Sequence, residues 1–372
     1  MDDLGVNPAS EVRSTDREQD AHWGRRGSID GAWWSVSRHR ASGVHRGGLA
    51  DERPSICDGP LLGRRVLGTT SGVAPLSRPA GTPSLEGVRI GILHHAESQL
   101  LRQGYLIQLM AEYWTARGAE VVDIIGVETS IPVDVLLLHV DLSIVPEAYL
   151  QFARTYPRVI NLKAVDIRKA SYLDDLVDAS HEGDGPMIVK SDLNHGGVPE
   201  RLLVSKKHRV RRFISAVIRR LRRRLGLPTE IRSKAEYVIY PDRNSVPLRH
   251  FGDGAVVQPF RPERSGSDFV LREYYFFGKV EVLNKEVGSE PILTSGRQVD
   301  CRAGSPPAEV RAIRDRLHLD YGKIDYGCPD GVAVVYDANK SLGIRANPGE
   351  VTKTIASELA SGIDEWIRSD PS

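Results

Sequence analysis

The stretch from residue 323 to residue 343 limits the possible folds of this chain more than any other. Its sequence is Lys-Ile-Asp-Tyr-Gly-Cys-Pro-Asp-Gly-Val-Ala-Val-Val-Tyr-Asp-Ala-Asn-Lys-Ser-Leu-Gly. Pro329-Asp330-Gly331 is a turn signal between two runs rich in β-forming residues. The pattern therefore predicts a hairpin with strands near 323–328 and 332–338.

Three oxygen-bearing side chains of this hairpin have the chemistry of a metal site. Side chains alternate along a strand, so Asp337 and Asn339 face the same way. The hairpin folds Asp325 back towards them. Two carboxylates and one amide oxygen suit Mg²⁺, which keeps waters and bridges substrate phosphates. The alternative interpretation is a solvated hairpin with polar ends.

Composition narrows the class of protein. The 372 residues suffice for two or three domains, and a formal net charge of +1 gives no indication of a nucleic-acid or membrane role. Three cysteines form neither a metal-like cluster nor a disulfide framework, so a reducing cytoplasm fits best. No apolar run approaches the roughly 20 residues of a membrane span. Arg25-Arg26 precedes no apolar core, which argues against an export signal.

The first 85 residues differ from the rest of the chain. They are rich in Gly, Ser, Arg, Asp and Pro and show no sustained periodicity. Such a segment cannot bury enough apolar surface to offset its ordering entropy. We predict a disordered N-terminal tail over 1–85. A start codon assigned too far upstream is the alternative source of this composition.

Strand and helix patterns alternate over the next segment, 86–162. Apolar runs predict strands, and helical spacing of Leu and Tyr predicts the helices between them. This alternation predicts a parallel α/β sheet. No G-x-G-x-x-G follows the first strand, so a dinucleotide site is not expected. His94, His95 and Glu97 follow that strand, as ligand-crevice residues or as polar loop residues. The predicted strands are 88–94, 121–125, 135–140 and 158–162, and the predicted helices are 99–117 and 146–156.

Two lysines and a glycine pair follow. Lys169 precedes a stretch with helical spacing within 163–181. Lys190 lies on an apolar strand, where a buried ammonium is costly unless it meets an anion. The strand runs into Asn194-His195-Gly196-Gly197, whose glycines allow backbone N–H groups to approach phosphate oxygens. The lysine and the glycine loop together suit a loop that covers a bound polyphosphate. The alternative is an ordinary turn.

A basic amphipathic helix is predicted over 206–225. Its apolar stripe runs from Val210 to Leu225, and seven arginines lie mostly elsewhere on the helix. One interpretation is a docked helix with a solvated basic face. The other is an anionic partner such as nucleic acid, acidic substrate or a lipid surface. No interleaved aromatic residues indicate a base-stacking surface.

The remaining segments predict strands and two helices. A short strand at 255–260 precedes a hairpin over 269–287 that turns at Gly278-Lys279. Arg272 is a charge within that apolar hairpin, so it needs a partner: a phosphate, Glu273 or Asp325. Helices are expected over 307–318 and 350–367.

In this order the parts resemble an ATP-grasp ligase over roughly 86–368, of the glutathione synthetase and ribosomal-protein glutamate ligase type. Residues 337–343, Asp-Ala-Asn-Lys-Ser-Leu-Gly, resemble the family's Glu-x-Asn-x-x-x-Gly magnesium motif. Asp325 matches the upstream magnesium Asp, and Lys323 stands where the family often has Arg. Asp337 replaces the more usual Glu, which keeps the charge and shortens the reach by one methylene.

The resemblance implies further site residues. Lys169 and Lys190 resemble the two nucleotide lysines, and Asn194, Gly196 and Gly197 the phosphate loop. Residues 256–260 resemble the hinge strand beside adenine, which assigns Gln258 and Phe260 to nucleotide binding. Arg272, six residues before Gly278, resembles the phosphate-contacting arginine.

The same resemblance implies an architecture. The fold class is α/β, with α+β character in the C-terminal part. A Rossmann-like pre-ATP-grasp domain is expected at 86–162, and an ATP-grasp N-terminal subdomain with the basic helix at 163–256. The C-terminal subdomain, 257–372, would carry the magnesium site. Relatives often form dimers, so a homodimer is one expected assembly.

The implied activity is ATP-dependent ligation of a carboxylate to an amine, through an acyl phosphate, with release of ADP and phosphate. This chemistry needs charge neutralisation more than a protein nucleophile. Arg297 is the candidate for gripping the substrate carboxylate. ATP and Mg²⁺, with Mn²⁺ as the alternative metal, are the expected cofactors, and small-molecule or peptide carboxylates and amines the substrates. The competing interpretations are a catalytically inactive nucleotide-binding or scaffold protein, and a module that binds anionic polymers through 206–224.

Overall fold

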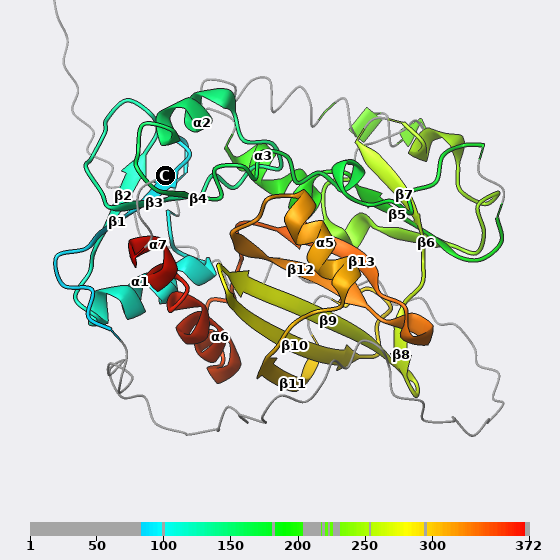
Figure 1. Ribbon diagram of the computed structural model, residues 1–372. Coiled ribbons are helices and arrows are strands. Elements are labelled where there is room, and N and C mark those ends of the chain that lie inside the picture. The colour runs from blue at the N-terminus through cyan, green and yellow to red at the C-terminus, as the bar shows by residue number, and fades with distance from the viewer. Residues whose placement is uncertain are drawn as a thin grey trace, which may run out of the picture. The chain divides into compact units, whose positions relative to one another are not determined.

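The computed structural model describes most of the chain beyond residue 82. The described residues are 83–98, 101–180, 183–203, 217, 220–221, 224–225, 231–252, 254–293 and 296–368, all within one compact unit, Ala50–Ser372 (Figure 1). The predicted tail lies outside these residues up to residue 82. Most of the predicted basic helix also lies outside them. Its described apolar residues Val217, Leu221 and Leu225 are each more than half exposed. The two interpretations of this helix stay predictions.

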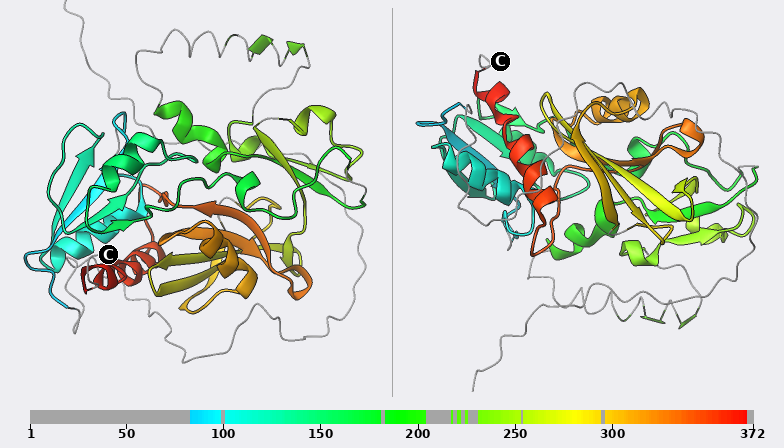
Figure 2. Two further views of the ribbon diagram at one scale, coloured as in Figure 1. Left: turned by 45° about the horizontal axis from the view of Figure 1, so that its top comes forward. Right: turned by 90° about the horizontal axis from the view of Figure 1, so that it is seen from below.

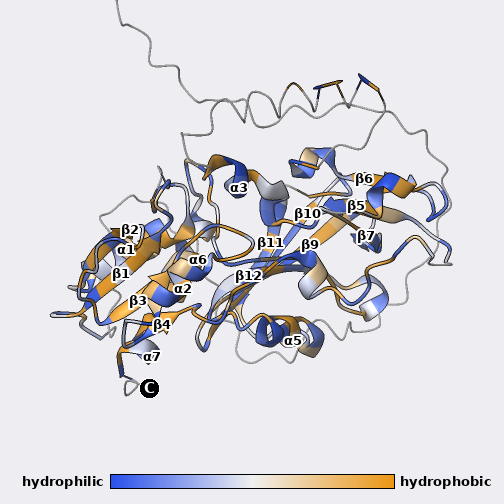
Figure 3. Ribbon diagram, turned by 90° about the horizontal axis from the view of Figure 1, so that it is seen from above, coloured by the Kyte–Doolittle hydropathy of each residue, from blue (hydrophilic) through white to orange (hydrophobic). Residues whose placement is uncertain are grey.

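The first sheet is parallel, as predicted. Its strands are β1 (Arg89–His94), β2 (Glu120–Ile125), β3 (Val135–Leu138) and β4 (Val159–Ile160), in the order β2-β1-β3-β4. Two helices connect them, α1 (Leu106–Ala116) and α2 (Glu147–Ala153). β1 and β3 are almost entirely buried and apolar along their length (Figure 3), as expected of parallel strands that are covered on both faces.

The second sheet is small and antiparallel. Its order is β6 (Val238–Tyr240), β5 (Met187–Ser191) and β7 (Ala255–Pro259). The helix predicted within 163–181 is wrong: only one 3-10 turn forms, η1 (Lys169–Ser171). Tertiary pairing prevents the helix, because the Val177 N–H donates to the Val257 carbonyl of β7 at 2.9 Å. Short turns complete this region, namely η2 (Asn194–Gly197), α3 (Val198–Leu202), η4 (Lys234–Glu236) and η5 (Leu248–His250).

The third sheet is large and antiparallel. Its main path is β11 (Arg297–Ala303), β10 (Val280–Gly288), β9 (Asp268–Phe277), β12 (Tyr321–Gly327) and β13 (Val334–Asn339). The strand β8 (Glu263–Ser265) pairs with β9. Both predicted hairpins are confirmed: β9 pairs with β10, and β12 with β13 through the turn η6 (Pro329–Gly331).

The two faces of this sheet have different surroundings. One face, here called the α5 face, packs Tyr274 and Ile324 into a core with the helix α5 (Ala308–Arg316). The other, here called the Asp325 face, is apolar at one end, where Phe277 and Val282 share a core with α1 and α6 (Glu350–Ala360). Its other end carries Asp325 and is polar.

The closing helix is shorter than predicted. It breaks into α6 and α7 (Ile363–Arg368) around Gly362. A Cβ on Gly362 would clash with the Phe277 carbonyl oxygen, so the chain passes β9 too closely for a larger residue. The indole Nε1 of Trp114 donates to the Ala360 carbonyl at 2.8 Å, which ties α6 to α1. The two helices pack side by side, the red helix α6 against the cyan α1 (Figure 2). Among the described residues, no helix has the length and apolarity to cross a membrane.

Candidate functional site

The hairpin of β12 and β13 brings the predicted metal ligands to one face. Asp325 and Asp337 stand directly opposite each other in the pairing of the two strands, and both are buried. Asn339 lies two residues further along β13, opposite Lys323, and is 9% exposed. Strand alternation therefore aligns all three side chains on the Asp325 face.

Three lysines surround the Asp337 carboxylate. Lys169 Nζ lies 3.0 Å from Asp337 Oδ1, and Lys234 Nζ lies 3.9 Å from Oδ2. Lys190, from β5, donates to the Tyr336 carbonyl at 3.0 Å. Burial opposes ionisation of Asp337, but the three ammonium groups outweigh it and lower the pKa of Asp337 to about 2. The carboxylate is therefore ionised at neutral pH.

Burial makes the charged form of Lys190 energetically unfavourable. This residue is 4% exposed, and burial, with Lys169 nearby, lowers the pKa of Lys190 to about 7. Its ammonium also donates to Gln258 Oε1. An amine with this pKa would become fully charged if a second anion arrived beside it. The predicted burial of Lys190 is confirmed, whereas its hydrogen-bond partners here are neutral oxygens and the anion stays a prediction.

A second ion-pair group lies beside the first. Lys323 Nζ is 2.9 Å from Asp325 Oδ1 and 2.6 Å from Glu273 Oε1, and Asn284 donates to the other Glu273 oxygen at 2.7 Å. Burial raises the pKa of Asp325, and the neighbouring carboxylates add to the rise. Asp325 Oδ1 is buried, and its only close contact among the described residues is the ion pair with Lys323, which lacks hydrogen-bond geometry.

These residues fit a magnesium ion that arrives with a polyphosphate. Among the described stretches, no three His, Cys, Asp or Glu side chains gather as a metal site. The chain here offers two carboxylates and one amide oxygen. Mg²⁺ prefers six oxygen ligands and commonly takes several of them from water and phosphate. Asp325 Oδ1 is buried and has a cation at 2.9 Å without a hydrogen bond, which favours a metal cation at this place.

The glycine loop lies against these strands. The turn η2 contacts both β5 and β13. His195, Gly196 and Gly197 all have left-handed backbone, with φ of 51°, 66° and 66°. A Cβ on Gly196 would lie 2.8 Å from the backbone of Ser233, so glycine is required there by packing. Asn194 is buried, and its N–H donates to Ser143 Oγ at 2.8 Å.

The predicted adenine residues have structural partners. The Gln258 amide donates to Asp175 Oδ1 at 2.7 Å and to the Val335 carbonyl at 3.0 Å, so it links β7 to β13. The Phe260 N–H donates to the Pro186 carbonyl at 2.7 Å, and that backbone donor is already used. The Phe260 ring is half-buried at the end of β7.

Neither predicted arginine reaches the Asp325 face. Arg272 lies on the opposite, α5 face, where its guanidinium makes two 2.8 Å hydrogen bonds to the Glu263 carboxylate. The expectation that Glu273 or Asp325 pairs with Arg272 is therefore wrong, because both belong to the other face. Arg297 is exposed at the start of the edge strand β11, opposite Val287.

A further polar group was not foreseen from the sequence. Lys340, one residue beyond β13, is 2% exposed, and its Nζ makes no hydrogen bond. Burial lowers the pKa of Lys340 to about 7, and burial raises the pKa of the nearby Asp141 to about 6. Asp141 accepts from the Tyr105 hydroxyl at 2.7 Å. His94, foreseen near the strand end, pairs with Asp123 at 2.8 Å.

Comparison with known proteins finds similarity only among solved structures: no protein-family model and no curated protein matches the chain. A RimK domain ATP-grasp protein from Sphaerobacter thermophilus is 15% identical, with a TM-score of 0.39 over 76% of this chain and 100% of that one. D-alanine–D-alanine ligase from Bacillus anthracis is 12% identical, with a TM-score of 0.34 over 76% and 98%.

A RiPP-associated ATP-grasp ligase from Chryseobacterium gregarium, in complex with ADP and with leader and core peptides, is 9% identical. Its TM-score is 0.32 over 73% of this chain and 96% of that one. Two of these three proteins bear the name of the class that the sequence motifs resemble. The identities and TM-scores are low, so the residues of the site itself carry the functional argument.

Proposed function

We propose that this protein binds Mg²⁺–ATP on the Asp325 face and uses it to join a carboxylate to an amine. The observation that carries the proposal is the pair of opposed, buried carboxylates, Asp325 and Asp337, faced by Lys169, Lys190 and Lys234. Buried charges of both signs in one place are expensive to maintain for stability alone. Metal–polyphosphate recognition needs both signs at once.

Each group has a role in this proposal. Asp325, Asp337 and Asn339 would hold Mg²⁺, which supplies neutralising charge between the phosphates. Lys169 and Lys190 would turn from their present partners to phosphate oxygens. Before a metal binds, the Lys169 ammonium would neutralise Asp337, to which it lies at 3.0 Å. Lys234, unforeseen in the sequence, adds a third cation.

The reaction that suits this set is carboxylate activation. A substrate carboxylate oxygen attacks the γ-phosphorus of ATP, and the bond between this phosphorus and the oxygen that bridges the β- and γ-phosphates breaks. ADP departs as the leaving group, and the substrate becomes an acyl phosphate. An amine then attacks the acyl carbon, loses a proton, and displaces phosphate. No protein nucleophile is required, because positioning and charge neutralisation dominate phosphoryl transfer. The loop Asn194–Gly197 would cover the phosphates and exclude water, which otherwise hydrolyses the acyl phosphate.

The substrates are proposed by class only, as small-molecule or peptide carboxylates and amines. Gln258 and Phe260 would border the adenine. Gln258 would act through Lys190, whose ammonium donates to its side-chain oxygen. Arg272 has no role in this proposal, since it faces the other way. Arg297 would need the strand β11 to rearrange before it could grip a substrate. A cytoplasmic location and a homodimer stay predictions from the sequence.

An assay of ADP release tests the proposal. The protein is incubated with Mg²⁺, ATP and pooled amino acids and small carboxylic acids, and products are identified by mass spectrometry. We expect carboxylate-dependent ADP formation that disappears in Asp325→Ala. Asp330→Asn is the matched control, because Asp330 is an exposed turn residue of the same hairpin with φ of 53°, which asparagine tolerates.

A second candidate is a nucleotide-binding or scaffold protein without turnover. The specific observation in its favour is that Arg272 and Arg297 both lie away from the carboxylates. ATP binding without ADP release across the whole pool would support this candidate against the ligase. Absence of ATP binding would refute both.

A further inference from the structure

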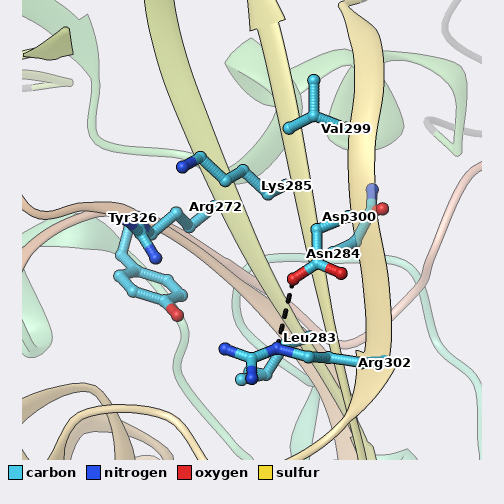
Figure 4. A pocket seen from close by; sticks show the side chains of 8 residues that line it. All are labelled: Arg272, Leu283, Asn284, Lys285, Val299, Asp300, Arg302 and Tyr326. Atoms are coloured by element: carbon cyan, nitrogen blue, oxygen red, sulfur yellow. Dashed lines mark ion pairs between the residues drawn. The ribbon is translucent and has the colours of Figure 1, made fainter. Parts of the chain in front are cut away.

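A cavity opens on the α5 face of the large sheet, behind the candidate nucleotide site. It measures about 270 Å³. Figure 4 shows its side chains coming from β9, β10, β11 and β12. The cavity is lined by Arg272, Leu283, Asn284, Lys285, Val299, Asp300, Arg302 and Tyr326. The sheet itself separates this space from Asp325 and Asp337.

Strand register explains why cations gather here. Lys285 stands opposite Arg272 on one side and opposite Asp300 on the other, and Arg302 stands opposite Leu283. Residues two apart on a strand share a face, so Arg272, Lys285 and Arg302 all belong to the α5 face. Three cationic side chains therefore border one small space.

The acidic groups around the cavity do not balance these cations. Arg272 is paired with Glu263, and Arg302 Nε lies 3.1 Å from Asp300 Oδ2. Lys285 makes no ion pair with any described residue, although it is half-buried. One positive charge thus remains at the wall of the cavity.

A second observation also points to a missing acceptor. Arg302 Nε is buried and makes no hydrogen bond, because its contact with Asp300 lacks hydrogen-bond geometry. A buried donor without an acceptor costs free energy that a ligand oxygen would recover. Leu283 and the Tyr326 ring give the cavity an apolar part.

We propose that this cavity binds a small organic anion, a carboxylate or a phosphate, through Lys285 and Arg302. The bidentate Glu263 contact neutralises Arg272 and fixes it as a rigid part of the cavity wall. The volume lies just below the range of about 300–1,000 Å³ typical of sites for drug-sized ligands, so the ligand is small. This site is additional to the nucleotide site and does not depend on the ligase activity.

Binding of defined anions tests the proposal. Inorganic phosphate and succinate are titrated into the full-length protein by calorimetry at constant ionic strength, with and without saturating Mg²⁺–ATP. We expect saturable binding of at least one anion. Lys285→Met should weaken it by about tenfold or more. Lys279→Met is the control: Lys279 lies in the turn of the same hairpin, is 87% exposed, and pairs with Glu365 at 2.9 Å. Its affinity should match the wild type.

Phosphate and succinate distinguish the two chemical classes of anion, since the anion that binds more tightly shows whether the site prefers a phosphate or a carboxylate. Three results would overturn the proposal. The first is that neither anion shows saturable binding up to about 20 mM. The second is that Lys285→Met binds the anion with the same affinity as the wild type, and the third is that Mg²⁺–ATP competes with the anion. Each would leave the ADP-release assay unaffected, so failure here is distinguishable from failure of the proposed function.

Discussion

Asp337 is predicted to stabilise the free protein because it neutralises buried lysines. Its pKa falls from the ordinary value of 3.8 to about 2 through Lys169, Lys234 and Lys190, which outweigh the opposing effect of burial. That difference is equivalent to about 2 kcal/mol of unfolding free energy at neutral pH. Asp337→Asn also leaves the buried Lys169 unpaired, and breaking a buried pair costs about 3–5 kcal/mol. We expect a loss between these limits, about 3 kcal/mol.

The pH dependence has a definite sign. A carboxylate with a lowered pKa contributes stability that is present above its unfolded pKa and is lost as pH falls through its folded pKa. The difference between wild type and Asp337→Asn should therefore be constant above about pH 5 and should shrink towards pH 2. Once Asp337 is protonated, it no longer differs in charge from asparagine.

Urea unfolding followed by circular dichroism, in EDTA and without nucleotide, measures this difference at several pH values. Asp330→Asn removes the same charge from the exposed turn of the hairpin, and its stability should stay within about 0.5 kcal/mol of wild type. If Asp337→Asn were equally mild at pH 7, the lysine cluster would not depend on Asp337. A loss that stayed constant down to pH 3 would refute the linkage to Asp337 ionisation.

Three further outcomes are expected. ATP binding at pH 8 should be accompanied by uptake of close to one proton, because the pKa of Lys190 is lowered to about 7 and a bound phosphate would raise that pKa. Calorimetry in buffers of different ionisation enthalpy measures the proton uptake, and Lys190→Met should abolish the uptake. Gly196→Ala should weaken ATP binding and lower stability by about 1–3 kcal/mol, since φ is 66° and its Cβ would meet the Ser233 backbone; titration and urea unfolding check both. Arg272→Met should destabilise by about 3 kcal/mol by stranding Glu263, and adding Glu263→Gln should restore much of the loss in the same unfolding assay.

Local signals account for the features that the sequence predicted well. The turn residues Pro329–Gly331 and the alternation of polar residues on both sides are enough to predict the hairpin and its aligned carboxylates. The buried apolar runs of β1 and β3 likewise predict parallel strands. These elements depend on patterns within a few residues, which a single sequence displays directly.

Long-range register explains what the sequence could not predict. Arg272 and Glu273 are neighbours in β9, and only the pairing of β9 with β12 decides which of them shares a face with Asp325. Lys234 comes from a loop-rich segment without any local signal, yet it lies 3.9 Å from Asp337. The helix predicted within 163–181 fails for a similar reason, since the Val177 N–H pairs with a strand 80 residues away.

Distant packing also sets the environment of Lys340. The sequence places it beside the metal motif, but its burial depends on contact between the segment after β13 and α1, where the Leu106 N–H donates to the Leu342 carbonyl at 2.7 Å. Similarly, a glycine is required at position 362, where the closing helix is interrupted, because Phe277 lies against it. Such contacts join residues that no periodicity connects.

Magnesium dependence of ATP binding tests the central claim most directly. Isothermal titration of ATP into wild type and Asp325→Asn, each with Mg²⁺ and with EDTA, separates the metal from the nucleotide. We expect EDTA to weaken binding to wild type by about tenfold or more, and Asp325→Asn to lose most of that magnesium effect while keeping its fold. Equal ATP affinity with and without Mg²⁺ in wild type, or an unchanged magnesium effect in Asp325→Asn, would contradict a Mg²⁺–ATP site on the Asp325 face.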